Sequence, residues 1–193
     1  MTTNRTRRWF AGAATILAAA LGGAAVAPTP AHAAWSWTLT DGFENNPNGR
    51  WTRNFHGAGT AANYDTAGLY ARTGFINAWM TAGASDTFVT TRRDVTLQLS
   101  GPSRCGASVY LSSAPGAAVN LEIIDPATWD YVSLRTVVVT GDGYHRYEFN
   151  NWEPRTSTVI LRMALLGDLD YLTTPGPHLR LEDVEVGCSK QPT

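Results

Sequence analysis

The chain has 193 residues, of which 44% are hydrophobic and 16% charged, and it carries 15 basic against 16 acidic residues. A near-neutral balance argues against a protein that binds the phosphate backbone of nucleic acids, because such binding depends on many Lys and Arg contacts. The length suits a single globular domain. We therefore expect one domain with no nucleic-acid partner.

Residues 1–33 have the features of a secretory signal peptide. Three arginines precede an Ala-rich apolar run, and residues 31–33 (Ala-His-Ala) form a cleavage site of the A-x-A type. Residues 6–10 (Thr-Arg-Arg-Trp-Phe) also resemble the twin-arginine export signal, although an ordinary signal with two adjacent arginines is the alternative. We expect a secreted, extracellular protein that begins near Ala34 and has no membrane segment after cleavage. Its 12 basic and 16 acidic residues would make it mildly acidic.

Short apolar alternations recur along the rest of the chain, separated by Gly, Pro, Asn and Asp. They predict strands at 35–44, 69–72, 75–82, 86–99, 104–112, 118–124, 130–140, 144–149, 157–166 and 178–187. A period of two over many short segments indicates an all-β fold, an antiparallel β-sandwich. We expect this single domain to span residues 34–188 as a monomer, followed by a polar tail at 189–193.

Turn residues lie between these expected strands. Gly141-Asp142-Gly143 predicts a hairpin turn, because Gly and Asp tolerate a positive φ angle. Pro115-Gly116 and residues 175–177 (Pro-Gly-Pro) predict loops.

Cys105 and Cys188 are the only cysteines. Two cysteines in an oxidising compartment predict one disulfide, which would stabilise the fold by closing a long loop. The alternatives are a reactive thiol or a metal ligand, and neither has a partner motif in the sequence.

The last expected strand changes its inward face partway along. Leu179 and Leu181 fall on odd positions, whereas Val184 and Val186 fall on even ones, which predicts a β-bulge at 182–183. Bulges turn carbonyl and carboxylate oxygens out of the ladder, and hard cations such as Ca²⁺ bind six to eight oxygens. Together with the acidic segment 41–44 (Asp-Gly-Phe-Glu), this predicts a structural calcium site. A charged edge strand with a slip in its alternation is the alternative.

Four segments, taken in order, resemble the jelly-roll carbohydrate-binding modules of families four, nine, sixteen and twenty-two. Residues 41–44 followed by Trp51 resemble the opening of these modules, and residues 71–79 resemble the stretch after their second strand. The aromatic segment 144–149 (Tyr-His-Arg-Tyr-Glu-Phe) and the acidic closing strand 182–186 (Glu-Asp-Val-Glu-Val) complete the series.

This resemblance covers nearly all of residues 36–187 and implies a galactose-binding-like jelly roll of two antiparallel sheets. It also implies that Glu44 and Asp183 are calcium ligands, with Asp41 nearby. The segment 119–126 followed by Trp129 matches no ligand site of these families.

Aromatic side chains are the expected ligand contacts. Tryptophan and tyrosine rings bind sugars by stacking, and their polar tips add hydrogen bonds. The candidate ligand-binding residues come from the expected strands at 69–72 and 75–82, from the loop-to-strand junction near 130 and from a later loop: Arg72, Asn77, Trp79, Trp129, Tyr131 and Trp152. Each of them could instead be a packing residue of the sandwich.

These observations favour a non-catalytic module that binds a cell-wall or plant polysaccharide. We expect no catalytic residues, since Gly-x-Ser-x-Gly and His-Glu-x-x-His are absent. No pair of carboxylates is singled out by spacing among Glu122, Asp125, Asp130, Asp168 and Asp170, although a small glycoside-active enzyme is one alternative. A protein-binding or inhibitory sandwich is another, with Pro-bounded loops at 102–105 and 172–177 as its contacts.

Overall fold

The computed structural model describes residues 35–83, 86–99, 101–167 and 178–190, except for the side chains of residues 114, 115 and 142. It confirms the all-β antiparallel fold. The described part contains one short 3-10 helix and nine strands: β1 (Trp35–Asp41), η1 (Pro47–Gly49), β2 (Thr52–His56), β3 (Ala61–Asp65), β4 (Asn77–Thr81), β5 (Phe88–Thr96), β6 (Ser103–Ile124), β7 (Tyr131–Glu148), β8 (Thr158–Leu166) and β9 (His178–Lys190).

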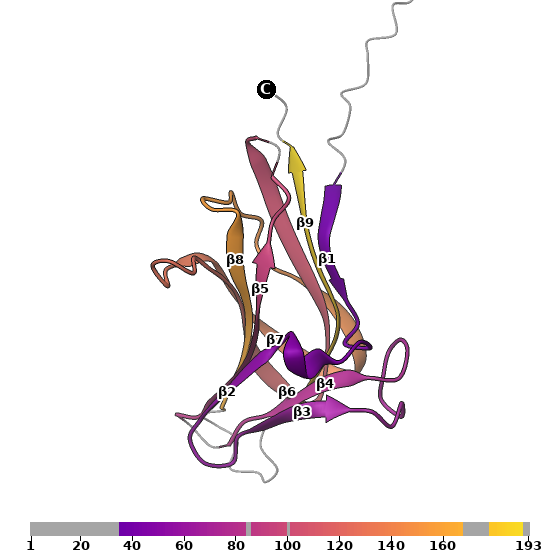
Figure 1. Ribbon diagram of the computed structural model, residues 1–193. Coiled ribbons are helices and arrows are strands. Elements are labelled where there is room, and N and C mark those ends of the chain that lie inside the picture. The colour runs from indigo at the N-terminus through magenta and orange to yellow at the C-terminus, as the bar shows by residue number, and fades with distance from the viewer. Residues whose placement is uncertain (1–34, 84–85, 100, 168–177, 191–193) are drawn as a thin grey trace, which may run out of the picture. The chain divides into compact units, whose positions relative to one another are not determined.

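The long strand β6 divides the sheet into two layers (Figure 1). In the first layer, residues 117–124 of β6 pair with the start of β7 and residues 119–124 pair with β8; β8 pairs with β5, and β5 with β2. In the second layer, the first half of β6 pairs with β9, which also pairs with β1 and β4, while β3 lies beyond β4. This arrangement is a β-sandwich.

The core lies between the two layers. In the first layer, three residues that lie opposite one another on neighbouring strands are fully buried: Val89 on β5, Leu165 on β8 and Val119 on β6. Leu181 and Leu111, which are partners in the second layer, are fully buried too and belong to the same apolar cluster. Side chains that alternate with these residues therefore point away from the core.

Three sequence predictions need correction. Residues 69–72 form a loop and not a strand. The strands β2 and β3 were not predicted, because each pairs with one neighbour at a sheet edge and has mostly polar residues. Gly141 and Gly143 do adopt positive φ angles of 91° and 124°, but they bend the continuous strand β7 instead of forming a hairpin turn. Residues 115–116 likewise lie within β6 and not in a loop.

The bulge predicted at 182–183 is confirmed. Glu185 and Glu182 of β9 lie opposite Ser108 and Tyr110 of β6, so β9 has one extra residue between these pairs. Asp183 adopts a φ of 46°, in the left-handed region. The apolar residues on either side of the bulge are all fully buried, which explains the change in alternation.

The predicted disulfide is present between Cys105 and Cys188, which lie opposite each other on β6 and β9 and are 83 residues apart. Strand β9 continues to Lys190, so Ser189 and Lys190 are part of the sheet and not of a tail. The expected signal peptide and the loop 172–177 lie outside the described residues. Of the residues that are described, none belongs to a helix that is long and apolar enough to cross a membrane.

Candidate functional site

The outer side of the first layer gathers charged and aromatic side chains. Arg92, Arg162 and Glu122 are partners in one row across β5, β8 and β6, and they alternate with core residues. Tyr131 is the partner of Ile124 at the start of β7, and Trp129 precedes it. We call the surface made by these five residues — Arg92, Glu122, Trp129, Tyr131 and Arg162 — the Arg162 face.

Arg162 links two other residues of this face. Its Nε donates to the carboxylate of Glu122, whose side chain is buried, and its Nη2 donates to the Tyr131 hydroxyl over 3.2 Å. Charge-assisted bonds of this kind fix the planes of the groups that make them. The exposed Tyr131 ring is therefore held from below by a buried ion pair.

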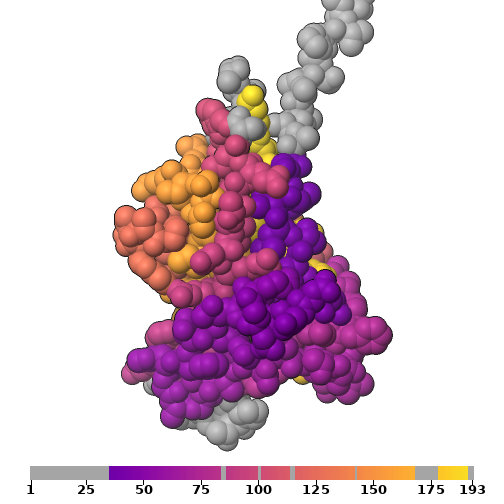
Figure 2. All heavy atoms as spheres, viewed as in Figure 1, coloured from indigo at the N-terminus to yellow at the C-terminus, as the bar shows by residue number. Residues whose placement is uncertain are grey.

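A turn presents the Trp129 ring. The Trp129 amide donates to the Asp125 carbonyl over 2.8 Å, and the Asp125 amide donates to the Asp130 carbonyl over 2.9 Å. Trp129 adopts a φ of 63° and is 52% exposed, and the Arg92 guanidinium lies 4.9 Å from the centre of its ring. Figure 2 shows the loop between β6 and β7, in salmon, projecting at the left of the view. A cation over one face of the indole stabilises its position and leaves ring surface exposed.

Three apolar residues on the same side of the first layer are buried. Ile124, Ile160 and Ala164 are at most 4% exposed, although they do not belong to the core between the layers. On the neighbouring row, the Thr136 hydroxyl donates to the amide oxygen of Asn120 over 2.8 Å. Exposed rings beside a charged pair and an amide are a combination that suits sugar binding.

Three predicted ligand contacts lie elsewhere, on the second layer. Trp79 of β4 stacks on His178 with ring centres 5.9 Å apart. Asn77 is fully buried and accepts a hydrogen bond from Arg180, and Arg72 lies over the Tyr110 ring at 3.6 Å. These three residues therefore do not lie with Trp129 and Tyr131 on the Arg162 face.

Trp152 is part of the core. It is 4% exposed, and its backbone exchanges hydrogen bonds of 2.8 and 3.0 Å with Cys105. A ring in this position stabilises the start of β6 and exposes little surface to a ligand. We therefore leave Trp152 out of the candidate site.

Asp41 serves as an anchor for the chain that follows it. Its carboxylate accepts hydrogen bonds from the Phe43 amide, over 2.8 Å, and from the Trp51 indole, over 2.9 Å. It also pairs with Arg50 and Arg93. These donors leave a buried carboxylate fully occupied, so Asp41 does not fit the predicted role of a metal ligand.

Glu44 and Asp183 do lie near each other, on either side of Gly42. A Cβ atom on Gly42 would be 3.2 Å from the Asp183 Oδ1 and 4.0 Å from the Glu44 Cγ. Glu44 accepts hydrogen bonds from the Phe75 and Ile76 amides, and a Cβ on Gly74 would overlap its carboxylate. This glycine-lined cradle with two carboxylates fits a hard cation that also uses backbone oxygens.

A third carboxylate lies beside this pair. Glu182 accepts hydrogen bonds from the Thr73 and Arg72 amides, and Asp183 pairs with the Arg72 guanidinium. Burial raises the pKa of Glu182, the two amide bonds oppose the rise, and the negative charges of Asp183 and Glu44 add to it. Within the described ranges, no three His, Cys, Asp or Glu side chains are arranged to hold a metal by themselves, so backbone oxygens would have to complete a site.

The carboxylates considered for catalysis are placed as follows. Glu122 is paired with Arg162, and Asp125 Oδ1 accepts a hydrogen bond from the Ala127 amide in the β6–β7 turn. Asp130 is exposed in the same turn. Asp168 and Asp170 lie outside the described residues. Glu122 and Asp125 therefore have structural partners.

The sequence did not single out Arg92 as a site residue. The odd–even alternation placed Arg162 on the face opposite the core, and the same signal on β5 could have added Arg92. The pairing of Arg162 with Glu122 across 40 residues of sequence depends on strand register, which the alternation alone does not give.

No protein-family model matches this sequence, and no curated protein matches it. Solved structures with the same fold do. The chain is similar to a xylan-binding domain, the first family-22 carbohydrate-binding module of Xyn10C from Paenibacillus barcinonensis. The two share 14% identity with a TM-score of 0.57, over 84% of this chain and 100% of that one.

Two further structures show how varied this fold is in use. A family-61 carbohydrate-binding module, TmCBM61, solved with β-1,4-galactotriose, matches with a TM-score of 0.51 and 14% identity over 76% of this chain and 97% of that one. The Stig cyclase Fisc from Fischerella sp. TAU matches with a TM-score of 0.55 and 10% identity over 81% and 100%. At these identities the matches establish the fold, a jelly roll shared with carbohydrate-binding modules.

Proposed function

We propose that this protein binds a cell-wall or plant polysaccharide through its Arg162 face and does not cleave it. The observation that carries the proposal is the half-exposed Trp129 ring, supported by Arg92 at 4.9 Å, next to a half-exposed Tyr131 whose hydroxyl is held by Arg162. Rings fixed before binding lose little conformational entropy when a sugar stacks on them. The shared fold with xylan- and galactotriose-binding modules supports the same ligand class.

A pull-down on insoluble cellulose, xylan, chitin and peptidoglycan tests this proposal. We expect retention on at least one polymer, with release by its soluble oligosaccharide. The Trp129→Ala variant should be retained more weakly, whereas Phe55→Ala, which removes an equally exposed ring from β2, should be retained as the wild type is. If none of the four polymers retains the protein, the proposal is contradicted. A protein partner, the main alternative for an exposed aromatic surface, would then be favoured.

The proposed absence of catalysis has its own test. Glu122 is buried against Arg162, so the face offers no described pair of carboxylates placed as acid and base. Incubation with the retained polymer should release no new reducing ends. Sustained release that Glu122→Gln abolishes would make the protein an enzyme and overturn this part of the proposal.

We propose secretion on the basis of the leader-like segment at 1–33 and the disulfide, since disulfides persist in oxidising compartments. Mass spectrometry of the protein from the culture medium should give an N-terminus near Ala34. Full-length protein that stays inside the cell would contradict it.

We also propose a structural Ca²⁺ held by Glu44 and Asp183, without Asp41. A cation there would tie the segment after β1 to β9, because these two residues belong to opposite ends of the chain. Addition of a calcium chelator should lower the melting temperature of the wild type and leave that of Asp183→Asn unchanged. A wild-type melt that is the same with and without chelator would contradict the site.

A further inference from the structure

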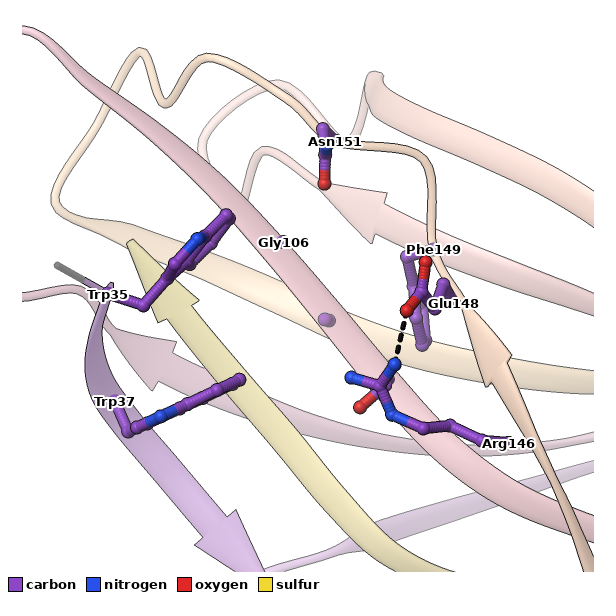
Figure 3. A pocket seen from close by; sticks show the side chains of 9 residues that line it. Trp35, Trp37, Gly106, Arg146, Glu148, Phe149 and Asn151 are labelled. Atoms are coloured by element: carbon purple, nitrogen blue, oxygen red, sulfur yellow. Dashed lines mark hydrogen bonds and ion pairs between the residues drawn. The ribbon is translucent and has the colours of Figure 1, made fainter. Parts of the chain in front are cut away.

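The second layer carries a hollow of about 340 Å³ on its outer side, away from the Arg162 face. Its walls include Trp35 and Trp37 from β1 on one side, and Arg146, Glu148 and Asn151 on the other, with Gly106 of β6 between them (Figure 3). None of the functions proposed above uses this hollow.

Two tryptophans form the apolar wall. Trp35 and Trp37 are two positions apart on β1 and share a side of the strand, with ring centres 6.3 Å apart and ring planes at 25°. They are 42% and 52% exposed. Adjacent, near-parallel indoles with this much exposed surface are uncommon on a surface without a binding role.

Two glycines make room for these rings. Gly187 of β9 and Gly106 of β6 lie opposite each other in the ladder, and Gly187 is also the partner of Trp37. A Cβ on Gly187 would come within 2.9 Å of the Trp37 ring, and one on Gly106 within 2.9 Å of the Asn151 side-chain oxygen and 3.2 Å of the Trp35 ring. Neither glycine has a positive φ, so it is the close approach of these neighbours, and not the glycine's own backbone angles, that disfavours a side chain here.

The opposite wall supplies hydrogen-bonding groups. Arg146 and Glu148 form an ion pair, and the second Arg146 nitrogen lies 3.9 Å from Glu185 of β9. Both paired side chains stay exposed to solvent, at 40% and 61%. A guanidinium has five donors and a carboxylate about four acceptor positions, so each can still bind a ligand.

The chemistry of the hollow selects one class of ligand. A flat apolar platform suits the C–H face of a pyranose, and the guanidinium, carboxylate and Asn151 amide suit its hydroxyl groups. Because Arg146 and Glu148 cancel each other's charge, the polar wall does not favour an anionic ligand. A neutral sugar fits both walls at once.

We propose that this hollow is a second carbohydrate-binding site, which takes a neutral pyranose unit over Trp35 and Trp37 with its hydroxyls bound by Arg146, Glu148 and Asn151. It goes beyond the proposed function, because it lies on the other layer of the sandwich and shares no residue with the Arg162 face. Two sites on opposite layers would let one molecule contact two polysaccharide chains and raise the overall avidity.

Titration followed by the indole N–H signals in NMR tests the second site. The probes are xylohexaose, cellohexaose, chitohexaose and β-1,4-galactotriose, and Trp35→Phe, Trp37→Phe and Trp129→Phe assign the signals. We expect at least one probe to shift the Trp35 and Trp37 signals with saturation, and the shifts to persist in Trp129→Ala. Arg146→Ala should weaken them about tenfold, whereas Arg155→Ala, which removes an exposed arginine that does not line the hollow, should not.

The outcomes separate the two sites. Shifts confined to Trp129 would overturn the second site and leave the proposed function in place. Shifts at Trp35 and Trp37 alone would support the second site and contradict the Arg162 face. If no probe shifts any of the three signals, both proposals fail.

Discussion

Trp51 and Trp129 show how differently one residue type is used in this sandwich. Trp51 is 3% exposed, packs on Phe43 with ring centres 5.2 Å apart, and donates its indole N–H to the Asp41 carboxylate. Trp129 is 52% exposed and touches a guanidinium that leaves ring surface to solvent. Trp51 therefore stabilises the fold, whereas Trp129 keeps ring surface for the proposed ligand, and we expect that each can be removed without loss of the other's role.

The largest expected effect is at the buried anchor. Asp41→Asn removes the charge that Arg50 and Arg93 face, and an unpaired buried charge costs about 3–5 kcal/mol of unfolding free energy. Urea unfolding followed by tryptophan fluorescence measures it. Asp94→Asn, an exposed carboxylate on β5, is the control and should change stability by about 0.5 kcal/mol or less. Equal effects of the two substitutions would contradict the role of Asp41.

The disulfide should give the next largest effect. Replacing both Cys105 and Cys188 with Ala removes a cross-link between residues 83 apart, which should cost about 2–5 kcal/mol. Because the pair lies away from the Arg162 face, the affinity of that face for the retained polysaccharide should stay unchanged below the melting temperature. A loss of affinity in the folded double variant would show that stability and binding are coupled.

The smallest expected effect concerns pH. Burial lowers the pKa of His178 below its ordinary value of 6.5, and the positive charge of Arg180 lowers it further. The unfolded chain therefore takes up a proton before the folded one does. The stability that neutral His178 contributes is full above pH 6.5 and is lost as the pH falls toward the lowered value.

Melting temperatures of the wild type and of His178→Gln between pH 7 and pH 5 check this prediction. The decline should be smaller in the variant. His145→Gln, an exposed histidine on β7, should decline as the wild type does. Identical slopes for the wild type and His178→Gln would show that this histidine does not contribute.

Strand alternation made much of the fold predictable. The parity change between Leu181 and Val184 located the bulge before any pairing was known, because a buried face constrains every second residue. The edge strands β2 and β3 escaped prediction since each has a neighbour on one side and keeps polar residues on both faces. The glycines at 141 and 143 correctly indicated positive φ angles, but they did not indicate whether the chain would reverse direction or continue as one strand.

The sites were less predictable than the fold. Trp129 and Tyr131 are two positions apart in the sequence, so their joint placement could be expected. Trp79 and Trp152 were predicted only because they are tryptophans, and the sequence does not show where they lie relative to Trp129. The hollow under Trp35 and Trp37 depends on Gly106 and Gly187 lying opposite each other, 81 positions apart in the chain. Such a meeting is fixed by register between distant strands, which no local pattern reports.

The most direct test of the account is isothermal titration calorimetry of the wild type and Trp129→Ala with an oligosaccharide of the retained polymer, alongside their thermal melts. Loss of the exposed ring should weaken binding at the Arg162 face about tenfold, equivalent to about 1.4 kcal/mol, while the melting temperature stays within about 2 °C. Unchanged affinity with an unchanged melt would contradict the assignment of binding to the Arg162 face.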